Sequence, residues 1–147
     1  YSGEIADIIT IKDGVDSINV QFYHLKFAKE GRVSTRVDNF YEVCGQAQKS
    51  IHWKHKSGLE FFQHLLRREK KTKKGVYRSR IEKGSKEDLE RLLGIAKNHK
   101  PMSFEIFIVQ PSLSKENTTD SIMRLLGVTE NYLKDVADID LKVIVNQ

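Results

Sequence analysis

The chain has 147 residues, with 25 lysines and arginines against 20 aspartates and glutamates, so its formal net charge is +5 and its isoelectric point is near 9.3. This length suits one domain with a hydrophobic core, and the composition excludes collagen-like, proline- and glycine-rich and acidic disordered chains. No apolar run approaches the roughly 20 residues that span a bilayer, and nothing at the start resembles a signal peptide.

The beginning of the chain predicts an antiparallel β-hairpin. Residues 5–11 are mostly apolar and rich in β-branched side chains, which favours a strand. The Asp13-Gly14 pair supplies turn chemistry, and residues 18–28 alternate well enough to form the returning strand.

A helical pattern follows. Asp38 is suited to cap a helix whose apolar positions recur at spacings of four, three and four: Phe40, Cys44, Ala47 and Ile51. A second helix is expected over residues 57–70, and a short strand over residues 76–81.

The centre of the chain predicts a capped helix and a buried strand. Ser85 and Asp88 have the spacing of a capping box, which indicates that a helix begins there and continues through His99. Residues 104–109 are almost continuously apolar, so we expect a strand deep in a sheet, ended by Pro111.

The last part predicts two short helices, 121–126 and 129–136, separated by Gly127, and then a strand over residues 141–145. The order of elements favours an α/β fold, in which a mixed sheet is flanked by helices and starts with a β-hairpin. We expect residues 1–147 to form a single domain. Because the sequence does not begin with methionine, we expect that domain to be a fragment of a larger protein.

The basic excess is concentrated in the segment 67–84, which we expect to be a loop. Nine basic and two acidic residues lie there, which leaves 16 basic and 18 acidic residues elsewhere. A second, smaller basic patch spans residues 49–56. Basic side chains neutralise phosphates and aromatic rings stack on bases, so both patches are candidates for nucleic-acid binding; a solvated loop or a localisation tract is the alternative. The candidate contact residues are Lys49, Trp53, Lys70, Lys71, Lys73, Lys74, Arg78 and Arg80.

Polar residues gather at the open end of the expected hairpin. Asp7 interrupts the first strand, and if the strands pair next to the turn it lies opposite residues near 22–24. His24 and Lys26 share one face because side chains alternate along a strand. A carboxylate can anchor a divalent cation, and a neighbouring positive group can orient water and stabilise charge during phosphodiester hydrolysis. The alternative is that these are ordinary solvent-facing strand ends.

These residues resemble the PD-(D/E)xK restriction-endonuclease-like nucleases, which place an aspartate before a hairpin and a lysine on the next strand. Here the motif is Asp7 followed by His24-Leu25-Lys26, and residues 37–50 resemble the helix that follows the catalytic strand. The likeness covers about residues 4–53. More narrowly, the chain is similar to nuclease-like domains that accompany helicase modules in large bacterial proteins.

The resemblance implies a role for each residue. Asp7 would be the metal-binding carboxylate and Lys26 the catalytic lysine. His24 stands where the superfamily usually has Glu or Asp, and Glu4 would supply the missing carboxylate. Gln46 occupies a position from which related nucleases present a glutamine to the site. The implied cofactor is Mg²⁺ or Mn²⁺, with weaker metal binding, a preference for Mn²⁺ or loss of activity as the open consequences of the histidine.

The leading hypothesis is therefore a metal-dependent DNA endonuclease domain, working as a module of a bacterial DNA-processing or defence protein whose parent chain carries a helicase or ATPase module. The first alternative is a catalytically degenerate DNA-binding module of the same fold that serves a partner helicase. The second is a protein-interaction domain. No membrane partner is expected, and the single cysteine, Cys44, favours a reducing, cytoplasmic location.

Overall fold

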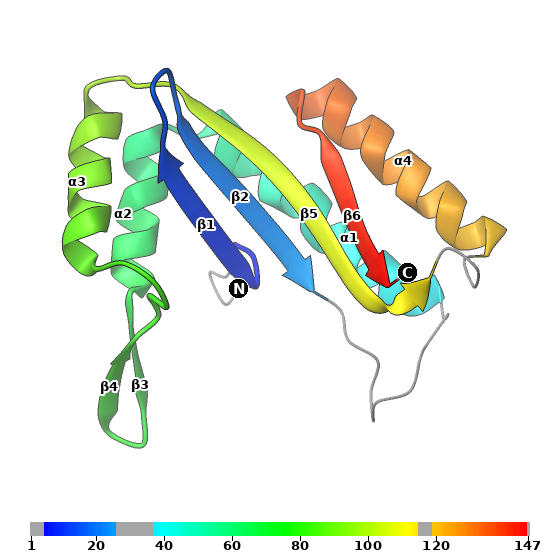
Figure 1. Cartoon of the computed structure of the whole chain (residues 1–147), viewed down its shortest axis with the longest axis horizontal. Coiled ribbons are helices and arrows are strands. Elements are labelled where there is room, and N and C mark those ends of the chain that lie inside the picture. Colours follow the sequence, from blue (N-terminus) through cyan, green and yellow to red (C-terminus); the bar gives the residue numbers. More distant parts are fainter. Residues whose placement is uncertain (1–4, 26–36, 115–118, 147) are drawn as a thin grey trace.

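The computed structural model describes residues 5–25, 37–114 and 119–146. In chain order (Figure 1) its elements are β1 (Ile8–Asp13), β2 (Ile18–Leu25), α1 (Val37–Ser50), the 3-10 helix η2 (Ile51–His55), α2 (Gly58–Arg68), β3 (Lys70–Lys73), β4 (Val76–Ser79), α3 (Lys86–Lys97), β5 (Met102–Ser114), α4 (Asp120–Ala137) and β6 (Leu141–Asn146). None of the helices in these ranges is long and apolar enough to cross a bilayer.

The main sheet is mixed and has the strand order β1-β2-β5-β6. β1 and β2 form the expected antiparallel hairpin, with Asp13 opposite Ile18 and Ile8 opposite Tyr23. β2 and β5 are parallel, as are β5 and β6. The predicted α/β class, with a mixed sheet that starts with a hairpin and is flanked by helices, is thus confirmed.

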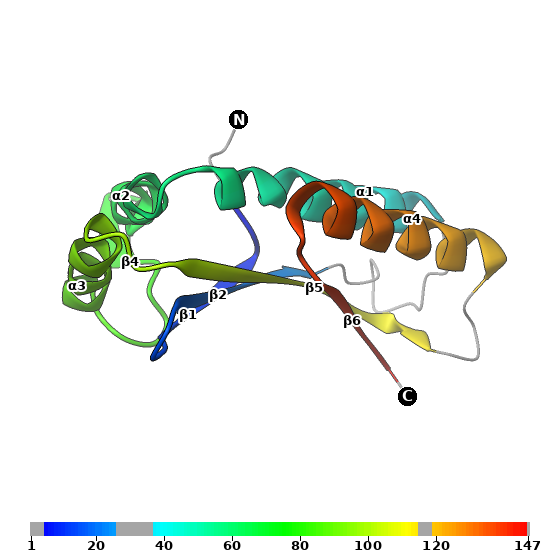
Figure 2. The same ribbon diagram turned by 90° about the horizontal axis from the view of Figure 1, so that it is seen from above.

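One face of β2 carries the core. Its residues alternate strictly between buried and half-buried, and the buried ones end with His24. Phe22 lies at the centre of this face, with its ring 5.5 Å from that of Phe104 and 6.0 Å from that of Phe61. Figure 2 shows α1 and α4 side by side on one face of the sheet. The hydrophobic contact of this face with the helices therefore positions the end of β2 beneath α1.

Three of the four α-helices begin at a residue whose side chain caps them, and for α4 this residue is Thr119, which accepts from the amide of Ile122. The capping box of α3 is present, with the Ser85 hydroxyl accepting from Asp88 N and the Asp88 carboxylate accepting from Ser85 N. Ser57 caps α2 in the same manner by accepting from the amide of Glu60. The expectation that Asp38 caps α1 is wrong, because that helix already begins at Val37. Of the expected apolar stripe, Cys44, Ala47 and Ile51 are buried, and the Phe40 side chain lies outside the described part.

The basic segment 67–84 is not the expected loop. It contains a second, two-stranded antiparallel sheet, β3 and β4, in which Lys71 lies opposite Arg78. The two-residue turn uses Lys74 and Gly75, both with positive φ (52° and 75°). Positive φ at both central residues is the requirement of the tight turns that match the twist of a hairpin.

Two expected breaks are also absent. β5 continues through Pro111 to Ser114, with an irregularity in its pairing with β6 between Gln110 and Ser114. A proline is tolerated at such a bulge because its missing N–H is not needed there.

Gly127 lies inside one continuous helix, α4, because the burial of residues on both sides of it outweighs the modest helix propensity of glycine.

Candidate active site

Asp7 is held at the open end of the hairpin by two backbone hydrogen bonds. Its amide donates to the carbonyl oxygen of Tyr23 at 3.1 Å, and its Oδ2 accepts from the amide of Leu25 at 2.8 Å. The carboxylate therefore caps the end of β2, next to His24. The side chain remains exposed, so its other oxygen can be reached from solvent.

His24 lies on the buried face of β2 and is only 2% exposed. Its Nε2 is 3.2 Å from Ser50 Oγ, and that hydroxyl donates its proton to the carbonyl oxygen of Ala47 at 2.7 Å. The hydroxyl must then accept from His24, so Nε2 carries the hydrogen and Nδ1 carries the lone pair of the neutral ring. Burial lowers the pKa of His24 to about 4, although the charge of Asp7 acts in the opposite direction. The imidazole is therefore neutral at pH 7 and has the form that binds metals.

Asp7 and His24 line one open cavity of about 650 Å³ between the hairpin, α1, η2 and α2. Two further residues predicted from the sequence, Gln46 and Lys49, lie in its wall on α1, and both are exposed. The complete lining consists of Ile5, Ala6, Asp7, His24, Gln46, Lys49, Ser50, His52, Trp53, Lys56 and His64. The fold thus brings together five of the predicted residues, Asp7, His24, Gln46, Lys49 and Trp53, from two distant parts of the chain.

Two of the predicted site residues, Glu4 and Lys26, lie outside the described residues. The basic hairpin is also not among the residues that line the cavity. Of its candidate contact residues, Lys70, Lys71, Lys74, Arg78 and Arg80 are exposed, and the side chain of Lys73 lies outside the described part.

Trp53, predicted as a nucleic-acid contact, is almost completely buried. It is only 7% exposed, and its ring packs against Phe61 with a centroid distance of 5.8 Å. The rings of His52 and His64 lie 4.6 and 4.7 Å from it. Since both neighbours belong to the same wall of the cavity, we assign Trp53 to packing of that wall rather than to stacking on a base.

Six lining residues were not predicted as site residues: the apolar Ile5 and Ala6, and the polar Ser50, His52, Lys56 and His64. His52 and Lys56 belong to the basic patch 49–56, so charge patterning could have found them. Ser50 and His64 become neighbours of the site only through packing of α1 and α2, for which the sequence carries no local signal.

The donors around the cavity suit a metal held mainly by water and substrate. A carboxylate oxygen of Asp7 and the neutral Nδ1 of His24 are both acceptable ligands for Mn²⁺, and Mg²⁺ usually keeps several waters beside one or two carboxylates. Within the described ranges there is no group of three or more His, Cys, Asp or Glu side chains that could hold a metal. A third protein ligand would therefore have to come from elsewhere, and Glu4 is the candidate from the sequence.

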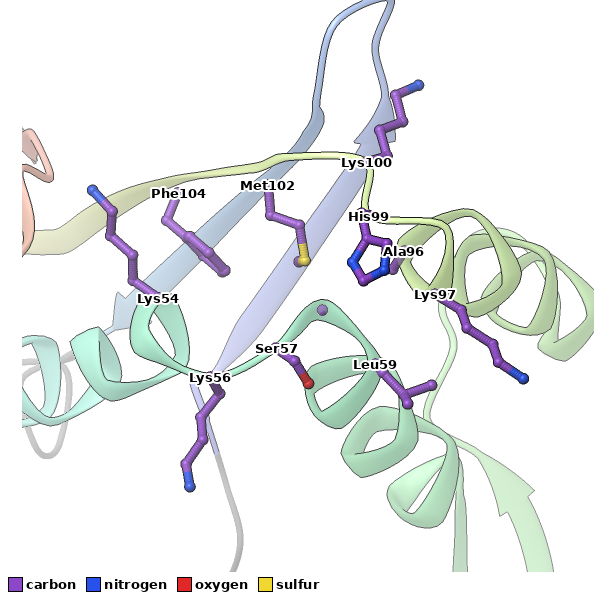
Figure 3. A pocket seen from close by; sticks show the side chains of 11 residues that line it. Lys54, Lys56, Ser57, Leu59, Ala96, Lys97, His99, Lys100, Met102 and Phe104 are labelled. Atoms are coloured by element: carbon purple, nitrogen blue, oxygen red, sulfur yellow. The ribbon is translucent and has the colours of Figure 1, made fainter.

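A second cavity, of about 380 Å³, lies where η2 and the start of α2 meet the end of α3 and the start of β5 (Figure 3). Met102 points into it. Two lysines at its rim are engaged elsewhere, because Lys54 Nζ donates to a carbonyl oxygen in α4 and Lys100 Nζ donates to Asp13 Oδ1 at 2.6 Å. This cavity therefore offers less reactive chemistry than the one beside Asp7 and His24.

Comparison with known proteins adds no assignment to this geometry. The chain matches no family model, no curated protein and no solved structure. The likeness to PD-(D/E)xK nucleases therefore rests on the sequence motif alone.

Proposed function

We propose that this chain is a metal-dependent DNA endonuclease domain with a restriction-endonuclease-like fold. The observation that carries the proposal is that Asp7 and His24 line one solvent-accessible cavity together with Gln46 and Lys49. A carboxylate and a neutral imidazole can bind a divalent cation, and an amide and an ammonium can contact phosphate oxygens, so these four groups suit metal-assisted phosphodiester hydrolysis.

In the proposed mechanism, Asp7 and the Nδ1 atom of His24 would hold Mg²⁺ or Mn²⁺, with Glu4 as the third protein ligand. The bound cation would polarise the phosphodiester and lower the pKa of a water molecule. Lys26 orients the attacking water and stabilises the additional negative charge that develops on the phosphate oxygens. The water gives up a proton to the solvent as its oxygen forms a bond to phosphorus, one P–O ester bond breaks, and the leaving oxygen takes up a proton from the solvent.

The helix α1 contributes substrate contacts in this scheme. Lys49 is exposed at the rim and is suited to neutralise a backbone phosphate near the scissile bond. Gln46 precedes Lys49 by three residues on the same helix and lines the same cavity. Its amide could donate to a phosphate oxygen or accept from the attacking water. Neither group needs to change its protonation state.

Nicking of supercoiled plasmid DNA tests the proposal. The wild-type chain is incubated with Mg²⁺, with Mn²⁺ or with a chelator, and beside it the Lys26→Ala variant. Metal-dependent nicking by the wild type, lost in the variant, is the expected result. Equal cleavage by both proteins, or cleavage in the chelator, would contradict the assignment of the site.

A second candidate function is a DNA-binding module of the same fold that has lost catalysis. It is favoured by the histidine at the usual place of a Glu or Asp and by the small number of metal ligands among the described residues. This candidate predicts salt-sensitive DNA affinity without turnover. In either case we propose that the domain works with a helicase or ATPase module in a bacterial DNA-processing or defence protein.

A further inference from the structure

The β3–β4 hairpin is a projecting arm. Figure 1 shows it extending beyond α2 and α3, on the side of the molecule where β1 begins and β2 ends. Residues 70–80 are exposed wherever their side chains are described, and Tyr77 is 74% exposed. Its short strands pair from Lys70 opposite Ser79 to Lys73 opposite Val76. Such an arm has no core of its own, so its sequence is free to serve another purpose.

Several basic residues of this arm lie at positions where they destabilise the hairpin. Lys71 and Arg78 lie directly opposite each other, and like charges at such positions destabilise a hairpin. Lys74 has a φ of 52°, in the left-handed region where asparagine or glycine is the preferred residue. Within the described part of the chain, no carboxylate forms an ion pair with these three side chains. A polyanion outside the domain is the partner that would make this arrangement favourable.

The arm is fixed at its base. Glu69, only 7% exposed, ends α2 and accepts the hydroxyl proton of Ser79 at its Oε1 with a distance of 2.6 Å. The carbonyl oxygen of Glu69 accepts from the amide of Arg80 at 2.6 Å, which continues the pairing of the two strands. The same helix carries His64, which lines the cavity of the candidate active site. The arm and that cavity are thus connected by one regular element.

We propose that the β3–β4 hairpin inserts into the major groove of double-stranded DNA, so that duplex DNA is the substrate class of this domain. The inference that the polyanion is DNA rests on the proposed function. A two-stranded ribbon, with strands about 4.8 Å apart, fits the B-form major groove, which is about 12 Å wide. The major groove of A-form RNA is too narrow for such a ribbon. Single strands are bound in basic grooves lined with several stacking rings, whereas this arm is convex and offers Tyr77 alone.

The test measures binding separately from cleavage. Fluorescence anisotropy in a chelator compares a DNA duplex of about 20 base pairs with its single strand and with an RNA duplex of the same sequence. One variant replaces Lys70, Lys71, Lys74 and Arg78 by Gln. A matched control replaces the same number of exposed bases outside the arm, Lys12, Lys86, Lys97 and Arg124, by Gln.

The wild type and the control are expected to bind the DNA duplex tightest, and the arm variant is expected to bind it at least tenfold more weakly. A plot of the logarithm of the association constant against the logarithm of the salt concentration should become less steep by about one for each phosphate contact that is lost. The inference is overturned if the arm variant binds the duplex as tightly as the control does, or if the wild type prefers the single strand or the RNA duplex. These outcomes are independent of nicking: a chain that binds through the arm and does not cleave contradicts only the proposed catalysis.

A second variant separates binding from folding. Lys74→Asn places a residue that favours the left-handed conformation at the turn and removes one charge. Its melting temperature should equal or exceed that of the wild type, while its duplex affinity and salt slope decrease. Unchanged duplex affinity and an unchanged salt slope in this variant would count against groove insertion of the turn.

Discussion

His24 Nε2 donates to Ser50 Oγ at 3.2 Å, and this bond joins the buried end of β2 to the last residue of α1. Because the serine hydroxyl donates onward to Ala47 O, the imidazole is fixed in one tautomer. The bond therefore determines which ring nitrogen carries the lone pair proposed for the metal. Protonation of His24 should also lower the free energy of unfolding, since a second ring proton would have to be accommodated in a buried position.

The first prediction is that stability falls as pH decreases below neutrality. The pKa of His24 is about 4 in the folded protein against an ordinary value of 6.5, so between these values only the unfolded chain binds the proton. The contribution is complete above about pH 6.5 and is lost progressively as pH falls toward 4, by about 3 kcal/mol in total. Urea denaturation at a series of pH values between 7.5 and 4.5 measures this loss.

The His24→Gln variant is the control for that measurement, because it retains a polar group near Ser50 and cannot titrate. Its stability should depend less on pH over the same range than that of the wild type. Parallel profiles for the two proteins would show that His24 is not buried as a neutral ring.

The second prediction concerns the metal preference. His24→Glu restores the carboxylate usual at this position of PD-(D/E)xK nucleases, and oxygen ligands are those that Mg²⁺ prefers. The ratio of nicking rates in Mg²⁺ and Mn²⁺ should shift toward Mg²⁺ by about tenfold, the low end of what changes around a metal site produce. In a chelator the variant should be less stable than the wild type, because a carboxylate at a 2% exposed position is costly. An unchanged metal ratio in the folded variant would place the metal away from residue 24.

The third prediction tests the continuity of α4. A Cβ added at Gly127 meets no atom within 4 Å, and the residue is helical. Gly127→Ala should therefore raise the free energy of unfolding by about 0.5–1 kcal/mol, because alanine loses less backbone entropy in a helix. Gly75→Ala is the contrasting variant, since its φ of 75° disfavours any Cβ and should lower the stability. A loss of stability in Gly127→Ala would instead indicate a break in α4.

Local signals in the sequence account for the elements that were predicted correctly. The Asp13-Gly14 turn and the Ser85–Asp88 capping box each depend on neighbouring residues, and each is present. In the basic hairpin, β4 (Val76–Ser79) lies within the strand expected over residues 76–81. Its partner β3 was missed because lysine has low strand propensity and the turn contains Lys74-Gly75 rather than Asn-Gly. At Gly127 the tertiary contacts of α4 outweigh the low helix propensity of glycine.

In the candidate site, too, the features set by neighbouring residues were predicted and those set by packing were not. Asp7 was expected opposite residues near 22–24, and the observed pairing of Ile8 with Tyr23 places it at the end of that range. Trp53 was predicted with Lys49 as a nucleic-acid contact, but α1 ends at Ser50, before Trp53. The tighter 3-10 turn that follows rotates the indole into the core. A change of helix type within a single turn has no clear signature in the sequence.

The central claim is that the Asp7 carboxylate belongs to a metal-dependent nuclease site. Asp7→Asn keeps an oxygen that can accept from the amide of Leu25 and removes the charge that a cation requires. Asp16→Asn, at an exposed position in the turn at the other end of the hairpin, is the matched control. The most direct measurement is the rate of plasmid nicking in Mn²⁺ by the wild type and these two variants. We expect the control to nick like the wild type and Asp7→Asn to be at least about 100-fold slower, the scale on which loss of one electrostatic contact to the reacting group acts. Equal nicking by all three proteins would contradict the claim.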